Sequence, residues 1–312
     1  MQLLDEAPVL DSEIDSLGHM NVRYYLTRVD RASRALLAAV GLASDSAAGA
    51  VIRRYDTYSR FHREQFAGAT LSVAGGVLDI QADFARCFFE IRNPAREEIA
   101  ATFITASTLI DTTSQRRLSF PAALAGVNEK YGVRLPDYGT PRSLSLDPPR
   151  TDVTLDMLSA RVSEEPAAGM MSGRRETTVN AQDCDQNGRL REDVDLMFIM
   201  HRPQSGESTP SFGPPVMRTD NGHRFSWAMI ETRALVLGRP RSGQRLVSIG
   251  ADIAHGERWR QSRRWAFVVE TGELVGVNDT VGIALDLDER RSIPIPGTIR
   301  ETIERTWLPD LA

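Results

Sequence analysis

The chain has 312 residues and a formal net charge of −5 at pH 7. Hydrophobic residues make up 41% and charged residues 25%, as in ordinary globular proteins, and the length favours two domains. The acidic balance argues against an extended nucleic-acid surface, which needs clustered positive charge. Apolar runs are too short for a membrane-spanning helix and the acidic N-terminus is unlike a signal peptide, so we expect a cytoplasmic protein.

The first half predicts one long helix followed by antiparallel strands. After a short leading strand at 7–10, residues 22–40 carry apolar side chains at helical steps of three and four, and Gly41 gives a natural stop. Four strand-like runs follow, at 50–61, 69–80, 84–91 and 99–111. A single helix cannot cover its own apolar face, so we expect an α+β unit with an antiparallel sheet curled around it.

The same order returns in the second half, at an offset of 170 residues between loops 13–19 and 183–189. A leading strand at 174–183 and a shorter helix at 190–201 precede four further strand-like runs, at 223–237, 244–254, 263–271 and 274–287. We therefore predict a first domain over 1–135, a Pro-rich linker over 136–170 and a second domain over 171–312. Residues 202–221 are expected to form a long loop, a candidate lid.

The loop before the first helix carries a recognisable pattern, Asp15-x-x-Gly18-His19-Met20-Asn21, followed by an aromatic-rich helix. This segment, 13–23, resembles the signature of hotdog-fold acyl-CoA and acyl-ACP thioesterases. The resemblance implies two tandem hotdog domains, each an antiparallel sheet wrapped around a long central helix. It also implies an intrachain pseudo-dimer, with further association into a homodimer left open.

By this resemblance Asp15, His19 and Glu64 take the catalytic places, although Leu17 stands where plant acyl-ACP thioesterases have Asn. Taken singly, Asp15 is an ordinary helix-capping residue, His19 a loop histidine and Glu64 a solvated strand residue. The resemblance outweighs those readings for Asp15 and His19, while the catalytic reading of Glu64 rests on it alone. The substrate-binding positions implied beside them are Gly18, Asn21 and Tyr24.

The second loop keeps Asp185 and Asn187 but has Arg189 in the histidine place, and its strand region reads Leu237-Gly238-Arg239 in place of a glutamate. The second domain is therefore expected to be a degenerate partner whose Asp185 and Asn187 line a shared cleft. His223 follows a Gly as His19 does, but no Asp or helix accompanies it, so we interpret it as a loop residue.

The resulting hypothesis is hydrolysis of an acyl thioester, acyl-CoA rather than acyl-ACP, with no metal or organic cofactor. Asp15 would carry the attack, His19 and the helix N-terminus would polarise the carbonyl, and Glu64 would assist from the following strand. A non-catalytic acyl-thioester binding protein and a hotdog dehydratase or hydratase remain as alternatives. The acyl group itself is not predicted.

Two further features have predominantly structural interpretations. Cys87 and Cys184, the only cysteines, are too few for a disulfide framework and are expected to pack in the core. The segment 256–265, rich in arginine and tryptophan, fits either a solvated hairpin or a clamp for the phosphates or adenine of coenzyme A.

Overall fold

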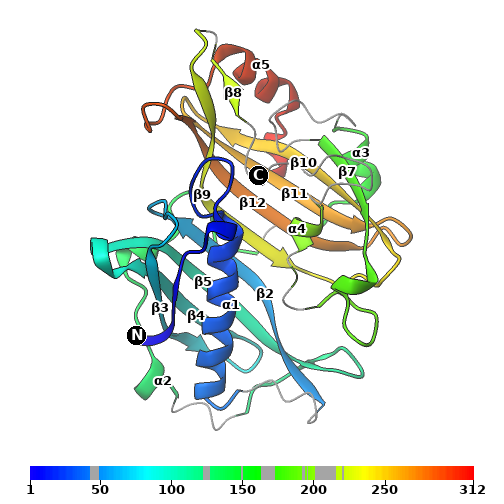
Figure 1. Ribbon diagram of the computed structural model, residues 1–312. Coiled ribbons are helices and arrows are strands. Elements are labelled where there is room, and N and C mark those ends of the chain that lie inside the picture. The colour runs from blue at the N-terminus through cyan, green and yellow to red at the C-terminus, as the bar shows by residue number, and fades with distance from the viewer. Residues whose placement is uncertain are drawn as a thin grey trace. The chain divides into compact units, whose positions relative to one another are not determined.

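The computed structural model describes residues 1–42, 49–121, 127–148, 150–162, 173–191, 194, 196–200, 216–219 and 221–312. These residues form two compact units, unit 1 (Met1–Arg142) and unit 2 (Ser143–Ala312), shown in Figure 1. Within the described ranges, no helix combines the length and the apolar character that a membrane crossing requires.

Unit 1 is an antiparallel sheet crossed by one long helix, α1 (Val22–Ala39). Its main strands pair in the order β1-β3-β4-β5-β2, with the short β6 added to β5. Two short helical segments, η1 and η3, lie in its loops, and α2 and η5 follow the last strand. The bounds are β1 (Gln2–Pro8), η1 (Asp11–Glu13), β2 (Ala50–Phe61), β3 (Thr70–Ile80), β4 (Ala85–Asn93), η3 (Pro94–Arg96), β5 (Glu98–Asp111), β6 (Arg117–Leu118), α2 (Val127–Tyr131) and η5 (Asp137–Gly139).

Unit 2 repeats this arrangement with strand order β9-β12-β11-β10-β7, and with the short β8 added to β9. Its helix α4 is much shorter than α1 within the described residues, and a further helix, α5, follows the last strand. The bounds are α3 (Leu155–Ser159), β7 (Gly173–Thr178), η6 (Ala181–Asp183), α4 (Leu196–Met200), β8 (Met217–Arg218), β9 (Arg224–Val236), β10 (Arg245–His255), β11 (Trp259–Val268), β12 (Leu274–Asp286), α5 (Gly297–Thr306) and η7 (Pro309–Leu311).

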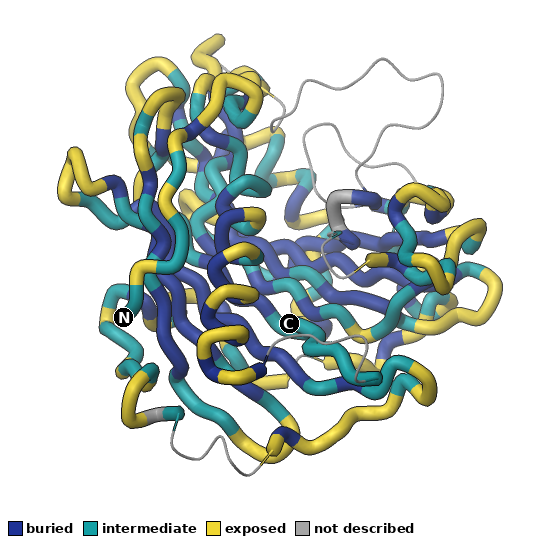
Figure 2. The backbone as a smooth tube through the Cα atoms, turned by 60° about the horizontal axis from the view of Figure 1, so that its bottom comes forward, coloured by how far each residue is buried: buried dark blue, intermediate teal, exposed yellow. Residues whose placement is uncertain are grey.

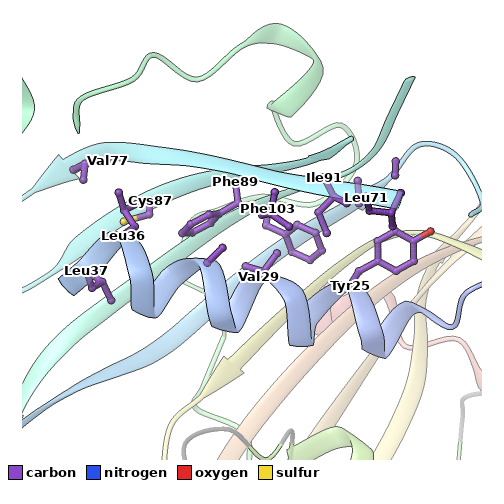
Figure 3. Close-up of a cluster of buried hydrophobic side chains, with 14 of the residues drawn as sticks. Tyr25, Val29, Leu36, Leu37, Leu71, Val77, Cys87, Phe89, Ile91 and Phe103 are labelled. Carbon is purple, nitrogen blue, oxygen red and sulfur yellow. The ribbon is translucent and has the colours of Figure 1, made fainter. Parts of the chain in front are cut away.

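The core of unit 1 lies between α1 and the sheet. One side of α1 is buried and the other exposed, as its tube in Figure 2 shows. Figure 3 shows Tyr25, Val29 and Leu36 on the helix side of the cluster, facing sheet residues that include Phe89 and Phe103. Val29, Leu36, Phe89 and Phe103 are each 0% exposed. This burial fixes the position of α1, and with it the position of its N-terminus.

The two units match in detail, since three irregularities in strand register fall at equivalent places. The shifts at Val77/Asp79, Ile91/Arg92 and Ala106/Ser107 in unit 1 recur 175 residues later in unit 2. Bulges bend a strand at a defined point, so shared bulges give both sheets the same curvature. The recurrences are at Asp252/Ala254, Ala266/Phe267 and Val281/Gly282.

The repeat extends beyond the last strand of each unit. The bridge between Val77 and Gly132 recurs between Asp252 and Trp307, again 175 residues later. Helices α2 and α5 precede these bridges, so both belong to the repeated unit. Helix α5 was not predicted from the sequence, although Pro296 before it and Ile299 and Ile303 four residues apart are helix signals.

Several predicted boundaries need correction. The leading strand is Gln2–Pro8 and not 7–10, because a register shift between Leu3 and Asp5 breaks the alternation of apolar residues. The second leading strand ends at Thr178, where the loop begins. The helix predicted over 190–201 is observed over Leu196–Met200. Residues 192–193, 195 and 201 and most of the predicted lid, 201–215 and 220, lie outside the described residues.

The arginine-rich segment 256–265 is neither a solvated hairpin nor an exposed clamp, because most of it forms β11 inside unit 2. Arg263 pairs with the buried Asp279 at 2.7 Å, and Arg264 donates to Ser248 Oγ at 2.8 Å. Burial, with the nearby charge of Arg175, lowers the pKa of Arg264 to about 9. Satisfied partners on neighbouring strands allow these arginines to be buried, which strand periodicity alone does not reveal.

The Pro-rich segment predicted as a linker contains the boundary between the units. On the unit 1 side, a Cβ added at Gly139 would lie 2.5 Å from the Phe88 ring, so this stretch packs directly on the sheet. On the unit 2 side, the backbone N–H groups of Ser143 and Leu144 donate to the carboxylate of Glu231 on β9. Each end of the segment is thus fastened to its own unit.

The packing of α1 predicts a sharp contrast between two substitutions on the helix. Leu36→Ala removes a fully buried side chain and should lower the free energy of unfolding by about 2–5 kcal/mol. Arg34→Ala, on the exposed side of the same helix, should change it by less than about 0.5 kcal/mol. Urea denaturation followed by circular dichroism measures both, and equal effects would contradict the proposed burial of this face.

Candidate active site

The candidate site is built on a tight loop between η1 and α1. The loop closes through a bridge between Ile14 and Met20, through Asp15 N donating to His19 O, and through Gly18 N donating to Asp15 O. Gly18 has a φ of +83°, a conformation that favours glycine, so Gly18 serves the turn. The loop thereby places Asp15 and His19 on the same side, directly before the helix.

The carboxylate of Asp15 is buried and held by donors from the loop itself. Its side chain is 2% exposed. Oδ1 accepts a hydrogen bond from Leu17 N at 2.9 Å, and Oδ2 lies 3.4 Å from Asn21 Nδ2. The backbone of Leu17 therefore contributes to the site although its side chain departs from the plant pattern.

His19 lies between two carboxylates. Its Nδ1 is 3.7 Å from Asp15 Oδ2, and its Nε2 is 3.5 Å from Glu64 Oε1. The Glu64 side chain is 34% exposed, against 15% for His19. Glu64 lies three residues beyond the end of β2, in the connection to β3, and not on the strand as predicted. The structure thus brings Asp15, His19 and Glu64 together.

A second histidine, His62, lies two residues before Glu64 but has a different environment. Burial, reinforced by the positive charges of Arg60 and Arg63, lowers the pKa of His62 to about 4. Its Nε2 is 3.1 Å from Thr102 Oγ1. His62 is therefore neutral at neutral pH and suited to packing within the sheet, not to proton transfer.

The N-terminus of α1 opens at the same place. Asn21 is the N-cap, its Oδ1 accepting from Arg23 N at 3.1 Å. The first turn of a helix presents N–H groups and the positive end of the helix dipole, which favour a developing negative charge. The hydroxyl of Tyr24 accepts from Arg23 Nη2 and donates to Ser12 O, so Tyr24 tethers the helix start to η1.

Two supporting residues were not found from the sequence. Arg28, 2% exposed on α1, donates to Ala7 O, Pro8 O and the carboxylate of Glu13. This ties α1 to β1 and η1. Gln65, 1% exposed, accepts a hydrogen bond from Met20 N on its backbone oxygen at 2.7 Å. Their partners are distant in sequence, so no local pattern points to either residue.

The equivalent loop of unit 2 has the same backbone and different chemistry. Asp185 N donates to Arg189 O, and Gly188 N donates to Asp185 O, as in the first loop. The bond from Met20 N to Gln65 O recurs from Leu190 N to Pro240 O, which makes Arg239 the equivalent of Glu64. Arginines therefore stand in the places of both His19 and Glu64.

The charge of Asp185 is committed within this second loop. Burial favours its neutral form, but the backbone N–H groups of Arg189 and Asn187 and the charge of Arg239 together lower its pKa. Arg239 Nη2 lies 3.3 Å from Asp185 Oδ2. The Asn187 side chain is on an exposed residue, and its backbone N–H donates to Asp185. The predicted placing of Asp185 and Asn187 in a shared cleft remains a prediction.

Comparison with known proteins identifies the fold. Residues 9–127 match the family model described as the thioesterase-like superfamily. The first unit is a thioesterase-like hotdog domain. No curated protein sequence matches the chain.

Three solved structures extend the similarity to the whole chain. A 12:0-ACP thioesterase from Umbellularia californica is 13% identical with a TM-score of 0.64, covering 90% of this chain and 93% of its own. An oleoyl thioesterase from Lactobacillus plantarum is 13% identical with a TM-score of 0.60, covering 91% and 97%. An acyl-ACP thioesterase from Bacteroides thetaiotaomicron is 10% identical with a TM-score of 0.59, covering 89% and 96%. The tandem hotdog fold predicted from the sequence is confirmed, and the family match and these neighbours support a thioester hydrolase.

The environment of Asp185 gives a prediction for acid titration. In Arg239→Gln the pKa of Asp185 should rise, because a cation is lost while the two backbone donors stay. A depressed folded-state pKa stabilises above the unfolded value of about 3.8, and this contribution is lost as pH falls through the folded value. The variant should therefore lose less stability on acidification. Carboxyl NMR measures the pKa, and an unchanged value would contradict the pairing.

Proposed function

We propose that unit 1 hydrolyses an acyl thioester at the loop before α1. The observation that carries the proposal is the placement of His19 between the carboxylates of Asp15 and Glu64, beside the N-terminus of a buried helix. Thioester hydrolysis requires a base for water and a donor for the developing oxyanion. The loop and the helix N-terminus supply these two functions from adjacent residues.

The accessibilities of the two carboxylates favour a division of roles that differs from the one expected from the sequence. Asp15 is 2% exposed and accepts from the loop backbone, whereas Glu64 is 34% exposed. A group that activates water must reach it. We therefore assign water activation to Glu64, orientation of His19 to Asp15, and a shared proton path to His19.

In this scheme water oxygen attacks the thioester carbonyl carbon while Glu64 takes the water proton. The carbonyl oxygen becomes negative and faces the N–H groups at the start of α1, which the Asn21 cap keeps in place. The carbon–sulfur bond then breaks, and the proton passes through His19 to the leaving thiolate. The products are the free acid and the thiol, and the carboxylate of Glu64 is restored.

The carrier remains to be assigned between two candidates. Acyl-CoA was expected from the sequence, while two of the full-length fold neighbours are named as ACP thioesterases. Matched acyl chains on coenzyme A and on acyl carrier protein, assayed with a thiol-reactive dye, separate the two. We expect turnover of the acyl-CoA series. Binding of either carrier without thiol release would favour a thioester-binding protein, and hydration of an enoyl thioester would favour a hydratase.

The proposal predicts unequal effects at equivalent positions of the two units. Glu64→Gln and Asp15→Asn keep side-chain size and remove a charge, so each should lower kcat at least about 10²-fold, with substrate binding retained. Asp185→Asn, the matched change in unit 2, should lower kcat less than about threefold, because Arg239 already occupies its carboxylate. A larger loss from Asp185→Asn than from Asp15→Asn would move the working site to unit 2.

The division of roles has a separate test. Single-turnover hydrolysis in ¹⁸O-water should place the label in the product acid and leave the Asp15 side chain unlabelled, since water attacks the substrate directly. Mass spectrometry of the peptide that contains Asp15 reads the outcome. Label in the Asp15 carboxylate would show that Asp15 itself is the nucleophile, as the sequence first suggested.

A further inference from the structure

Behind the candidate site lies a buried polar network centred on Gln65, the residue after Glu64. Gln65 Nε2 donates to Glu98 Oε1 at 3.0 Å and lies 3.4 Å from Arg63 O. Gln65 Oε1 accepts from Asn93 Nδ2 at 2.8 Å. Gln65 is 1% exposed and Asn93 3%. The network joins the β2–β3 connection to the end of β4 and the start of β5.

The backbone of Gln65 is also the link between the two halves of the site. Its carbonyl oxygen accepts from Met20 N at 2.7 Å, and the Tyr25 side chain also forms a hydrogen bond to the Gln65 backbone. Met20 follows His19, and Gln65 follows Glu64. A single backbone bond therefore sets the separation of the two segments that carry His19 and Glu64.

Unit 2 shows which of these bonds the fold itself requires. The backbone bond is kept there, from Leu190 N to Pro240 O at 2.9 Å. The side-chain network is not, because Pro240 has no side-chain amide and Val268 stands in the place of Asn93. The same strand register thus forms without the amide pair. The amide pair is present in the unit that carries His19 and Glu64.

We propose that Gln65 and Asn93 are positioning residues, which hold Glu64 within reach of His19 through the buried bonds to each other and to Glu98. This inference rests on the proposed function for its catalytic consequence. Buried amides with satisfied partners fix geometry strongly, because any displacement leaves a buried polar atom without its hydrogen bond. The network acts on the reaction through Glu64, without touching the substrate.

The test uses Gln65→Leu and Asn93→Val in the full chain, the second copying the residue of unit 2. Each should lower kcat about ten- to hundredfold with KM changed less than about threefold, as expected for a misplaced catalytic group. The decisive measurement repeats them in a Glu64→Gln background. There each should lower kcat by less than about twofold further, because the group that they position is already disabled.

The matched control is Val77→Ala, a buried change at the opposite end of α1 (Figure 3). It should lower Tm and leave kcat within about twofold of the wild type. If the network variants instead reduce kcat by the same factor with and without Glu64, their role is purely structural and the inference is overturned. Two variants are used so that one remains informative if the other does not fold.

A readout independent of activity separates this inference from the proposed function. In either network variant the backbone amide order parameter of Glu64 should fall, and hydrogen exchange of the Met20 amide should accelerate, because the bond between Met20 and Gln65 is loosened. If the wild type releases no thiol from any acyl thioester, the proposed function fails and these two measurements alone decide. Unchanged order and exchange would overturn the inference.

Discussion

The burial of α1 against the sheet of unit 1 is the interaction on which the candidate site depends. The helix contributes no catalytic side chain from its middle, but its apolar side determines where its first turn stands. Arg28 then ties that turn to β1 and to Glu13 in η1 through three hydrogen bonds. A catalytic loop held in this way can keep a buried carboxylate, a histidine and a helix N-terminus in fixed relation, with little reorganisation during reaction.

The repeat separates what the fold needs from what the chemistry needs. Strand register, bulges and loop backbone recur at a constant offset, while the side chains that they carry diverge. Phe89 in the core of unit 1 is replaced by Arg264, and Val73 by Ser248, at equivalent register positions. Those replacements keep the strands paired because the buried arginine finds a hydroxyl partner. A duplicated sheet thus tolerates polar substitution wherever partners are substituted with it.

Much of unit 1 could be predicted because its signals are local. The helical spacing from Tyr25 to Leu36 and the alternating strands after it follow from periodicity alone, and the Gly18-His19 turn is contiguous in sequence. The placing of Glu64 came from the family resemblance, and only its position on a strand was wrong. Sequence could not reveal Gln65, because its partners Asn93 and Glu98 come together only when the strands pair.

Unit 2 was harder to predict for the same reason. Its arginines at 260, 263 and 264 are exposed residues by composition and buried residues by partnership, and that partnership is a property of the folded sheet. The helix α5 carries few apolar residues, so its weak periodicity was overlooked. Side chains that depend on distant partners are the common element in these misses.

The central claim is that the reacting thioester binds at the start of α1 in unit 1. A crystal structure with a non-hydrolysable thioether analogue of the acyl-CoA that turns over best tests it most directly. We predict the atom that replaces the carbonyl group at the first turn of α1, within contact of Glu64 and His19. An analogue seated instead at the Asp185 loop of unit 2 would contradict the account.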